Sequence, residues 1–144
     1  MEINGLAHVF LTVSDFAACR AFYGELLPAL GLKAVMDADG WYYCVGGRTA
    51  IGITRGNAAA GDRFVQSRVG LHHLCFRARE RGDVDEVHRL VQRLGAKIVH
   101  PPQEDGFAPG YYSVLFEDPD GIRLEINHVP GKGLLAESTP PGEG

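Results

Sequence analysis

Short segments with contrasting hydrophobic periods run through the chain and predict a mixed α+β fold. In residues 6–13 (LAHVFLTV) every second side chain is apolar, the period of a strand with one buried face. Residues 16–30 instead repeat apolar positions every three or four residues, as an amphipathic helix does, and they follow a Ser-Asp pair suited to capping a helix. Gly-containing turns then separate three short strand candidates, at 32–37, 41–46 and 49–54.

The same succession of elements returns after a polar, glycine-containing connection at 56–68. A strand is expected within 70–78 (GLHHLCFRA), followed by an amphipathic helix at 83–94. The remaining elements are expected to be a strand at 96–99, a Pro/Gly loop at 101–110, and strands at 111–117 and 122–128.

An internal repeat relates the two halves. The tetrapeptide GLAH that begins at Gly5 aligns with the GLHH that begins at Gly70, and AIGI at 50–53 aligns with RLEI at 123–126. We therefore predict two tandem βαβββ modules whose sheets together form a concave cavity. The boundaries expected from this alignment are 3–55 and 69–128 for the modules, 1–128 for the single domain, and 129–144 for a flexible tail.

Strand alternation assigns the side chains of the two modules to faces. The apolar positions that match between the first strands of the modules, such as Leu11 and Phe76, are expected to pack under the helices. The intervening positions then face the cavity. This places three candidate ligands there (His8, His73 and Glu125), with further lining expected from Phe10, Tyr42 and Cys75.

Two imidazoles and one carboxylate are suitable ligands for a divalent metal, and they leave positions open for substrate or water. A metal held in this way can act as a Lewis acid on substrate oxygens, and Glu125 could serve both as ligand and as catalytic base. Other candidates to assist catalysis are Tyr111, Tyr112 and His128. The repeat pairs His72 with Ala7 on the helix-packed face, and the DPDG turn at 118–121 is interpreted as structural.

Composition narrows the class of partner. The chain has 144 residues and a formal charge of −4, with no cluster of basic residues, so we do not expect it to bind nucleic acid. We expect no membrane association, because the apolar runs are too short to span a bilayer. Three cysteines with no metal-knuckle spacing, and a start that lacks a signal-peptide pattern, favour a cytoplasmic protein with reduced thiols.

Three segments carry a resemblance to a known family: HVFLTVSD leading to AFYGELLPALGLK, GLHHLCF, and FEDPDGIRLEI. They resemble the vicinal oxygen chelate superfamily, which includes glyoxalase I, extradiol dioxygenases and bleomycin-resistance proteins. The resemblance covers about residues 3–128 and implies the paired βαβββ fold, a homodimer, a small-molecule substrate, and metal ligands at His8, His73 and Glu125. The metal implied is Fe, Mn, Ni or Zn.

Two positions depart from the family pattern. The fourth-strand ligand of the family falls on Gly52, which argues against a lactoylglutathione lyase, and the Tyr that several members carry ten residues before the Glu is Leu115. The sequence therefore leaves three functions open. The first is a metal-dependent lyase, isomerase or ring-cleaving dioxygenase; the second is a metal-free protein that binds a planar ligand, as bleomycin-resistance proteins do; the third is a structural or regulatory dimer.

Overall fold

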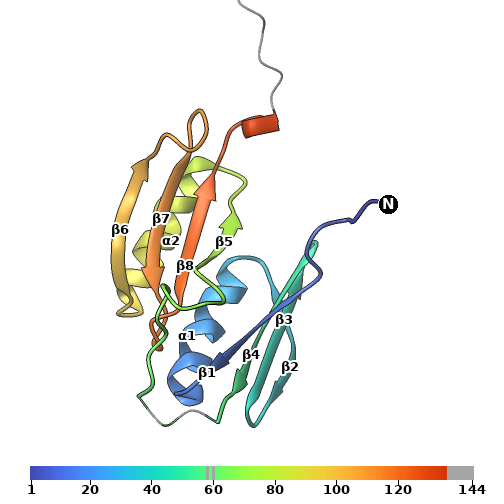
Figure 1. Cartoon of the computed structure of the whole chain (residues 1–144), viewed down its shortest axis with the longest axis vertical. Helices are drawn as coiled ribbons and strands as arrows, with labels where there is room; N and C mark the ends of the chain where they lie inside the picture. The colour runs from blue at the N-terminus through green and yellow to red at the C-terminus, as the bar shows by residue number, and fades with distance from the viewer. Residues whose placement is uncertain (58, 60, 136–144) are drawn as a thin grey trace, which may run out of the picture.

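A computed structural model describes residues 1–57, 59 and 61–135, and it contains two four-stranded sheets, each with its own helix (Figure 1). The first module comprises β1 (Val9–Val13), α1 (Phe16–Ala29), β2 (Lys33–Ala38), β3 (Trp41–Gly46) and β4 (Thr49–Arg55). The second comprises β5 (Leu74–Arg77), α2 (Arg81–Arg93), β6 (Lys97–Glu104), β7 (Tyr112–Glu117) and β8 (Arg123–His128). A short 3-10 helix, Gly133–Leu135, follows, and residues 136–144 of the predicted tail lie outside the described residues.

The two sheets have the same topology, which confirms the predicted pair of βαβββ modules. Their strand orders are β1-β4-β3-β2 and β5-β8-β7-β6. In each sheet the first strand runs parallel to the last, and the other neighbours are antiparallel. The pairing places Phe10 opposite Gly52 in the first sheet and Cys75 opposite Glu125 in the second. Equivalent positions of the repeat therefore occupy equivalent places in the two sheets.

Local sequence signals account for the ends of the helices. The Asp15 carboxylate accepts a hydrogen bond from the Ala18 amide at 3.0 Å and caps α1. In the second module, the Asp83 carboxylate accepts from the Glu80 amide at 3.0 Å, so α2 begins at Arg81, two residues before the predicted start. A glycine with positive φ follows each helix: Gly31 at +88° and Gly95 at +76°.

The predicted loop at 101–110 is wrong over its first residues, because β6 continues through Pro101 and Pro102 to Glu104. Proline has no amide hydrogen to donate, so it is tolerated mainly in edge strands or at bulges. β6 meets both conditions. It lies at the edge of its sheet, and its register against β7 shifts between His100 and Gln103.

The two modules share one hydrophobic core and a buried polar junction. The core joins side chains of α1 to strands of the second sheet; for example, the rings of Phe22 and Phe116 lie 6.5 Å apart. Next to it, the hydroxyl of Tyr23 donates to the Asp118 carboxylate at 2.6 Å. Asp118 also accepts from two amides of its own turn, and Asp120 accepts from the Ser14 hydroxyl at 2.9 Å. The DPDG turn is therefore structural, as predicted, and its two aspartates connect the second module to the first through hydrogen bonds.

Candidate functional site

The second sheet carries a cluster of polar side chains around Glu125. Glu125 is buried in the middle of β8, and His73 lies just before β5, the parallel neighbour of β8. His73 Nε2 lies 3.1 Å from Glu125 Oε2. The other carboxylate oxygen of Glu125 accepts a hydrogen bond from the Tyr111 hydroxyl. Two of the three predicted metal ligands are thus brought together, and each oxygen of the carboxylate has its own partner.

His72 extends this cluster, although the repeat placed it on the helix-packed face. It is exposed, and its Nδ1 shares a 2.7 Å hydrogen bond with Nδ1 of His73. The reason is that β5 begins only at Leu74, so residues 72 and 73 lie outside the strand and do not alternate between its faces. A partner on Nδ1 fixes the orientation of the His73 ring and directs Nε2 toward Glu125.

Burial and the charge of Glu125 keep two neighbouring groups protonated. Burial, followed by the hydrogen bond to Glu125, raises the pKa of Tyr111 far above its usual 10. Packing around the sulfur, followed by the Glu125 charge, raises the pKa of Cys75 to about 12. The cluster therefore holds a neutral phenol that donates to Glu125 and a neutral thiol beside it. Tyr112, also considered from the sequence, bonds instead to Asp85.

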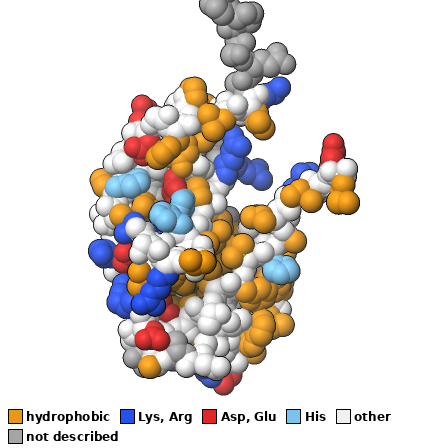
Figure 2. All heavy atoms as spheres, viewed as in Figure 1, with side chains coloured by type: hydrophobic (Ala, Val, Ile, Leu, Met, Phe, Trp, Pro, Cys, Tyr) orange, Lys and Arg blue, Asp and Glu red, His pale blue; other side chains and the backbone are white. Residues whose placement is uncertain are grey.

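The first sheet presents a different surface, made of aromatic rings. The ring of His8, just before β1, meets Phe10 edge-on at 5.5 Å, and Phe10 stacks with Tyr43 at 5.2 Å and 18°. Trp41 meets Phe10 edge-on at 5.4 Å. Phe10 and Trp41 keep 39% and 45% of their surfaces exposed. Hydrophobic side chains gather over this sheet at the lower right of Figure 2.

Tyr42, predicted to line the cavity, lies instead on the helix-packed face. Tyr42 is 2% exposed and pairs with Ile53. The Arg20 guanidinium lies over its ring, 3.9 Å from the ring centre. Its neighbour Tyr43 pairs with Gly52 and faces the open side. The sequence WYYCVG contains two consecutive tyrosines, which point to opposite faces of the sheet. Only the register of β3 determines which tyrosine faces the open side.

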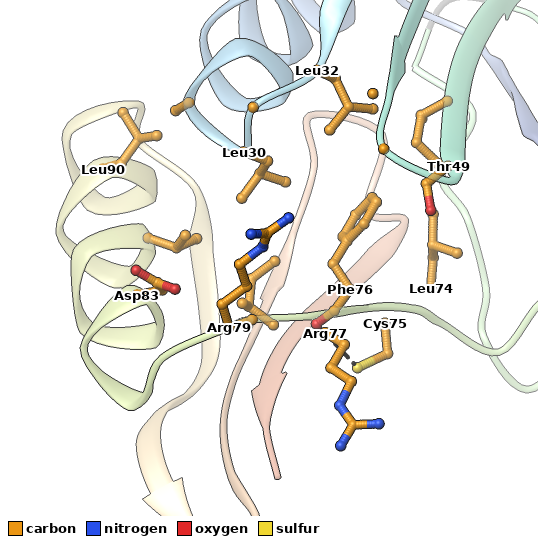
Figure 3. Close-up of a pocket in the computed structure, with 18 of the residues that line it drawn as sticks. Leu30, Leu32, Thr49, Leu74, Cys75, Phe76, Arg77, Arg79, Asp83 and Leu90 are labelled. Atoms are coloured by element: carbon orange, nitrogen blue, oxygen red, sulfur yellow. Dashed lines mark hydrogen bonds between the residues drawn. The ribbon is translucent and has the colours of Figure 1, made fainter. Parts of the chain in front are cut away.

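His8 and the His73–Glu125 pair belong to different sheets. Over the described ranges, no three His, Cys, Asp or Glu side chains converge in a way that could hold a metal ion. A cavity of about 1080 Å³ lies between the modules and is walled by α1, β5 and α2. In Figure 3, Phe76 and Arg79 point into it toward Leu32 and Leu30, whereas Cys75 points away. His8 and Cys75 also line this cavity, whereas His73, Glu125 and Tyr111 do not.

Comparison with known proteins identifies the family. Residues 5–126 match the glyoxalase/bleomycin resistance protein/dioxygenase superfamily. The YqjT protein of Bacillus subtilis is 30% identical over 122 residues, which cover 83% of this chain and 94% of that protein.

Solved structures agree with this assignment. A putative glyoxalase from Bacillus halodurans superposes with a TM-score of 0.75 at 28% identity, covering 88% of this chain and 96% of the other. A glyoxylase/bleomycin resistance protein/dioxygenase domain from Frankia sp. EAN1pec gives 0.71 at 27% identity, covering 88% and 98%. Among the described helices, none has the length and apolar character to cross a bilayer. The family predicted from the sequence is thereby confirmed: the chain belongs to the glyoxalase/bleomycin resistance protein/dioxygenase superfamily.

Proposed function

We propose that the protein is a metal-dependent enzyme that binds a small substrate through two adjacent oxygen atoms. The observation that supports this most directly is the approach of His73 Nε2 to Glu125 Oε2 at 3.1 Å on an open sheet face. When two ligand atoms each lie about 2.0–2.2 Å from the same ion, the two atoms are typically separated from each other by a distance like the 3.1 Å between Nε2 and Oε2. The donor set, an imidazole and a carboxylate, suits Fe, Mn, Ni or Zn.

The third ligand in this proposal is His8, supplied by a second copy of the chain. Within one chain His8 lies on the aromatic first sheet, and the His73–Glu125 pair lies on the second. A two-fold dimer that sets the first sheet of one copy against the second sheet of the other forms two equivalent sites. We accordingly propose a homodimer, with the folded domain spanning residues 1–128.

When bound, the ion supplies Lewis-acid chemistry to the two substrate oxygens. The chain's own residues supply the rest. His73, oriented by His72, and Glu125 would hold the ion, and the Tyr111 hydroxyl donates a hydrogen bond to the Glu125 oxygen that does not face His73. Tyr111 therefore holds the Glu125 carboxylate in place and leaves its other oxygen facing His73. We assign Glu125 as both ligand and base. The three free cysteines suit a cytoplasmic protein.

Metal content measured by mass spectrometry, on untagged protein purified without oxygen, tests this proposal. We expect about one transition-metal ion per chain, because each copy supplies one His73–Glu125 pair. The variants His8→Ala and His73→Ala should each lose the ion. His88→Ala is the matched control, since this histidine lies in α2, away from the cluster. Absence of bound metal from the wild-type protein, or full retention by His73→Ala, would contradict the proposal.

The aromatic surface of the first sheet favours a second candidate, a metal-free protein that binds a planar ligand. Exposed Phe10 and Trp41 provide ring surface for stacking without an ion. In that case His73→Ala and Glu125→Ala would leave ligand affinity nearly intact, and the wild-type protein would carry no metal.

A further inference from the structure

Three aromatic side chains of the first sheet form one continuous surface, the aromatic platform, defined as Phe10, Trp41 and Tyr43. Phe10 comes from β1, and the other two come from β3, with β4 running between these strands. The rings of Phe10 and Tyr43 are nearly parallel, 18° apart, and Trp41 meets Phe10 at 69°. Offset-stacked and edge-to-face contacts are the favoured aromatic geometries, so the rings hold one another in place.

Gly52 makes this arrangement possible. It lies in β4 between Phe10 and Tyr43, directly opposite both. A Cβ atom at this position would lie 2.3 Å from Cε1 of Phe10 and 2.5 Å from Cδ1, closer than carbon atoms can approach. Any side chain at residue 52 would therefore displace the Phe10 ring. The fourth-strand position that carries a ligand in the family pattern is here covered by a phenyl ring.

The platform is continuous with the proposed metal site, because the His8 ring contacts Phe10 at 5.5 Å. A substrate held beside His8 would extend across the neighbouring rings of the platform. Those rings are accessible, since Phe10 and Trp41 are 39% and 45% exposed. The three platform side chains are themselves uncharged and offer flat apolar area.

We infer that the aromatic platform binds a planar aromatic ring of the substrate. This inference rests on the proposed function for the placement of the two oxygens beside His8. It adds the chemical class of the remainder of the substrate: a flat, uncharged ring attached to the oxygen-bearing atoms. Short aliphatic substrates with the same pair of oxygens would leave the platform uncovered and bind more weakly.

Three hydroxamates that differ only in the attached group test the inference: benzohydroxamate, cyclohexanecarbohydroxamate and acetohydroxamate. Trp41 is the only tryptophan of the chain, so its fluorescence reports on the platform directly. The titrations use chelator-treated protein, with affinities checked by calorimetry. We expect benzohydroxamate to change the Trp41 emission and to bind about three- to tenfold more tightly than the cyclohexyl compound, the range typical of a favourable aromatic pair.

Variants locate the effect. Phe10→Leu should remove most of the preference for the planar ring, and Tyr43→Leu should reduce it, in proteins whose circular dichroism is unchanged. Phe16→Leu is the matched control, because Phe16 begins α1 and packs with the core on the other face of the sheet. Equal affinities for benzohydroxamate and cyclohexanecarbohydroxamate would overturn the inference, as would an unchanged preference in Phe10→Leu.

Two further outcomes separate this inference from its alternatives. Trp41 emission that varies with protein concentration but not with any hydroxamate would show that a second copy covers the platform, and would overturn the inference. A preference for the planar ring in chelator-treated protein would support the inference whatever the metal content. A metal-free wild-type protein with this preference would therefore contradict the proposed enzyme and leave the aromatic subsite standing.

Discussion

The buried contact between Tyr23 and Asp118 gives the sharpest stability prediction. Tyr23 is fully buried in α1, Asp118 is 4% exposed in the second module, and the hydroxyl donates to the carboxylate at 2.6 Å. Tyr23→Phe removes this donor and leaves one oxygen of a buried carboxylate without its partner. Hydrogen bonds to charged groups contribute about 1.5–3 kcal/mol, so we expect the free energy of unfolding to fall by about 2 kcal/mol at pH 7.5.

The effect should depend on pH in a defined direction. Burial raises the pKa of Asp118 from 3.8 to about 6 in the folded protein, and the Tyr23 hydrogen bond opposes this rise. Between these two values the folded state binds more protons than the unfolded state, so stability falls as pH rises from 4 to 6. For this group the loss is about 3 kcal/mol. Removing Tyr23 raises the pKa further, so Tyr23→Phe should cost more at pH 7.5 than at pH 5.

Urea unfolding at pH 7.5 and at pH 5 measures both quantities. Tyr112→Phe is the matched control, because its hydroxyl also donates to an aspartate, Asp85, at 2.6 Å, but in a half-exposed place. We expect this control to lose less than about 1 kcal/mol at either pH. A cost below 0.5 kcal/mol for Tyr23→Phe, or a cost that is larger at pH 5, would refute the reasoning.

Three further changes have expected outcomes. Gly52→Ala should shift the Trp41 emission and cost about 1–3 kcal/mol in urea unfolding, because the new Cβ overlaps the Phe10 ring; an unchanged spectrum would contradict this. Gly95→Ala should lower the free energy of unfolding by about 1 kcal/mol, since the φ of +76° at this residue disfavours a side chain. In the control Gly82→Ala, within α2, the new Cβ has no neighbouring atom to overlap, so this variant should not be destabilised. Tyr111→Phe should weaken zinc binding about 10- to 100-fold in a competition titration, as loss of a hydrogen bond to a metal ligand does; equal affinity would show that Tyr111 does not position Glu125.

Much of the fold could be predicted because two independent patterns agree. Strand and helix periods define the elements, and the internal repeat fixes their order, so an error in one module is corrected by the other. The length of β6 was not predicted by these patterns. Its prolines are typical of a loop, and only its place at the sheet edge makes them compatible with a strand.

The candidate site could be predicted only in part, for two physical reasons. Side-chain faces depend on register, and in WYYCVG a shift of one residue exchanges Tyr42 for Tyr43 without changing the hydrophobic pattern. Two residues at equivalent positions of a repeat also need not lie close together, because the repeat does not determine how the two modules are oriented relative to each other. His8 and His73 occupy matching positions, yet the structure sets them on different sheets. The support given to Glu125 by Tyr111 comes from a loop contact that no local spacing encodes.

Mixing two variants that each lack one predicted ligand tests the central claim, a metal site shared between two copies, most directly. In His8→Ala the His73–Glu125 pair is intact, and in His73→Ala the His8 is intact. After equal amounts are unfolded and refolded together, half of the dimers contain one copy of each, and each of these dimers has one complete site. The account predicts that bound metal recovers to about a quarter of the wild-type content. Recovery of no metal, in a mixture shown to contain the mixed dimer, would contradict a site built from both copies.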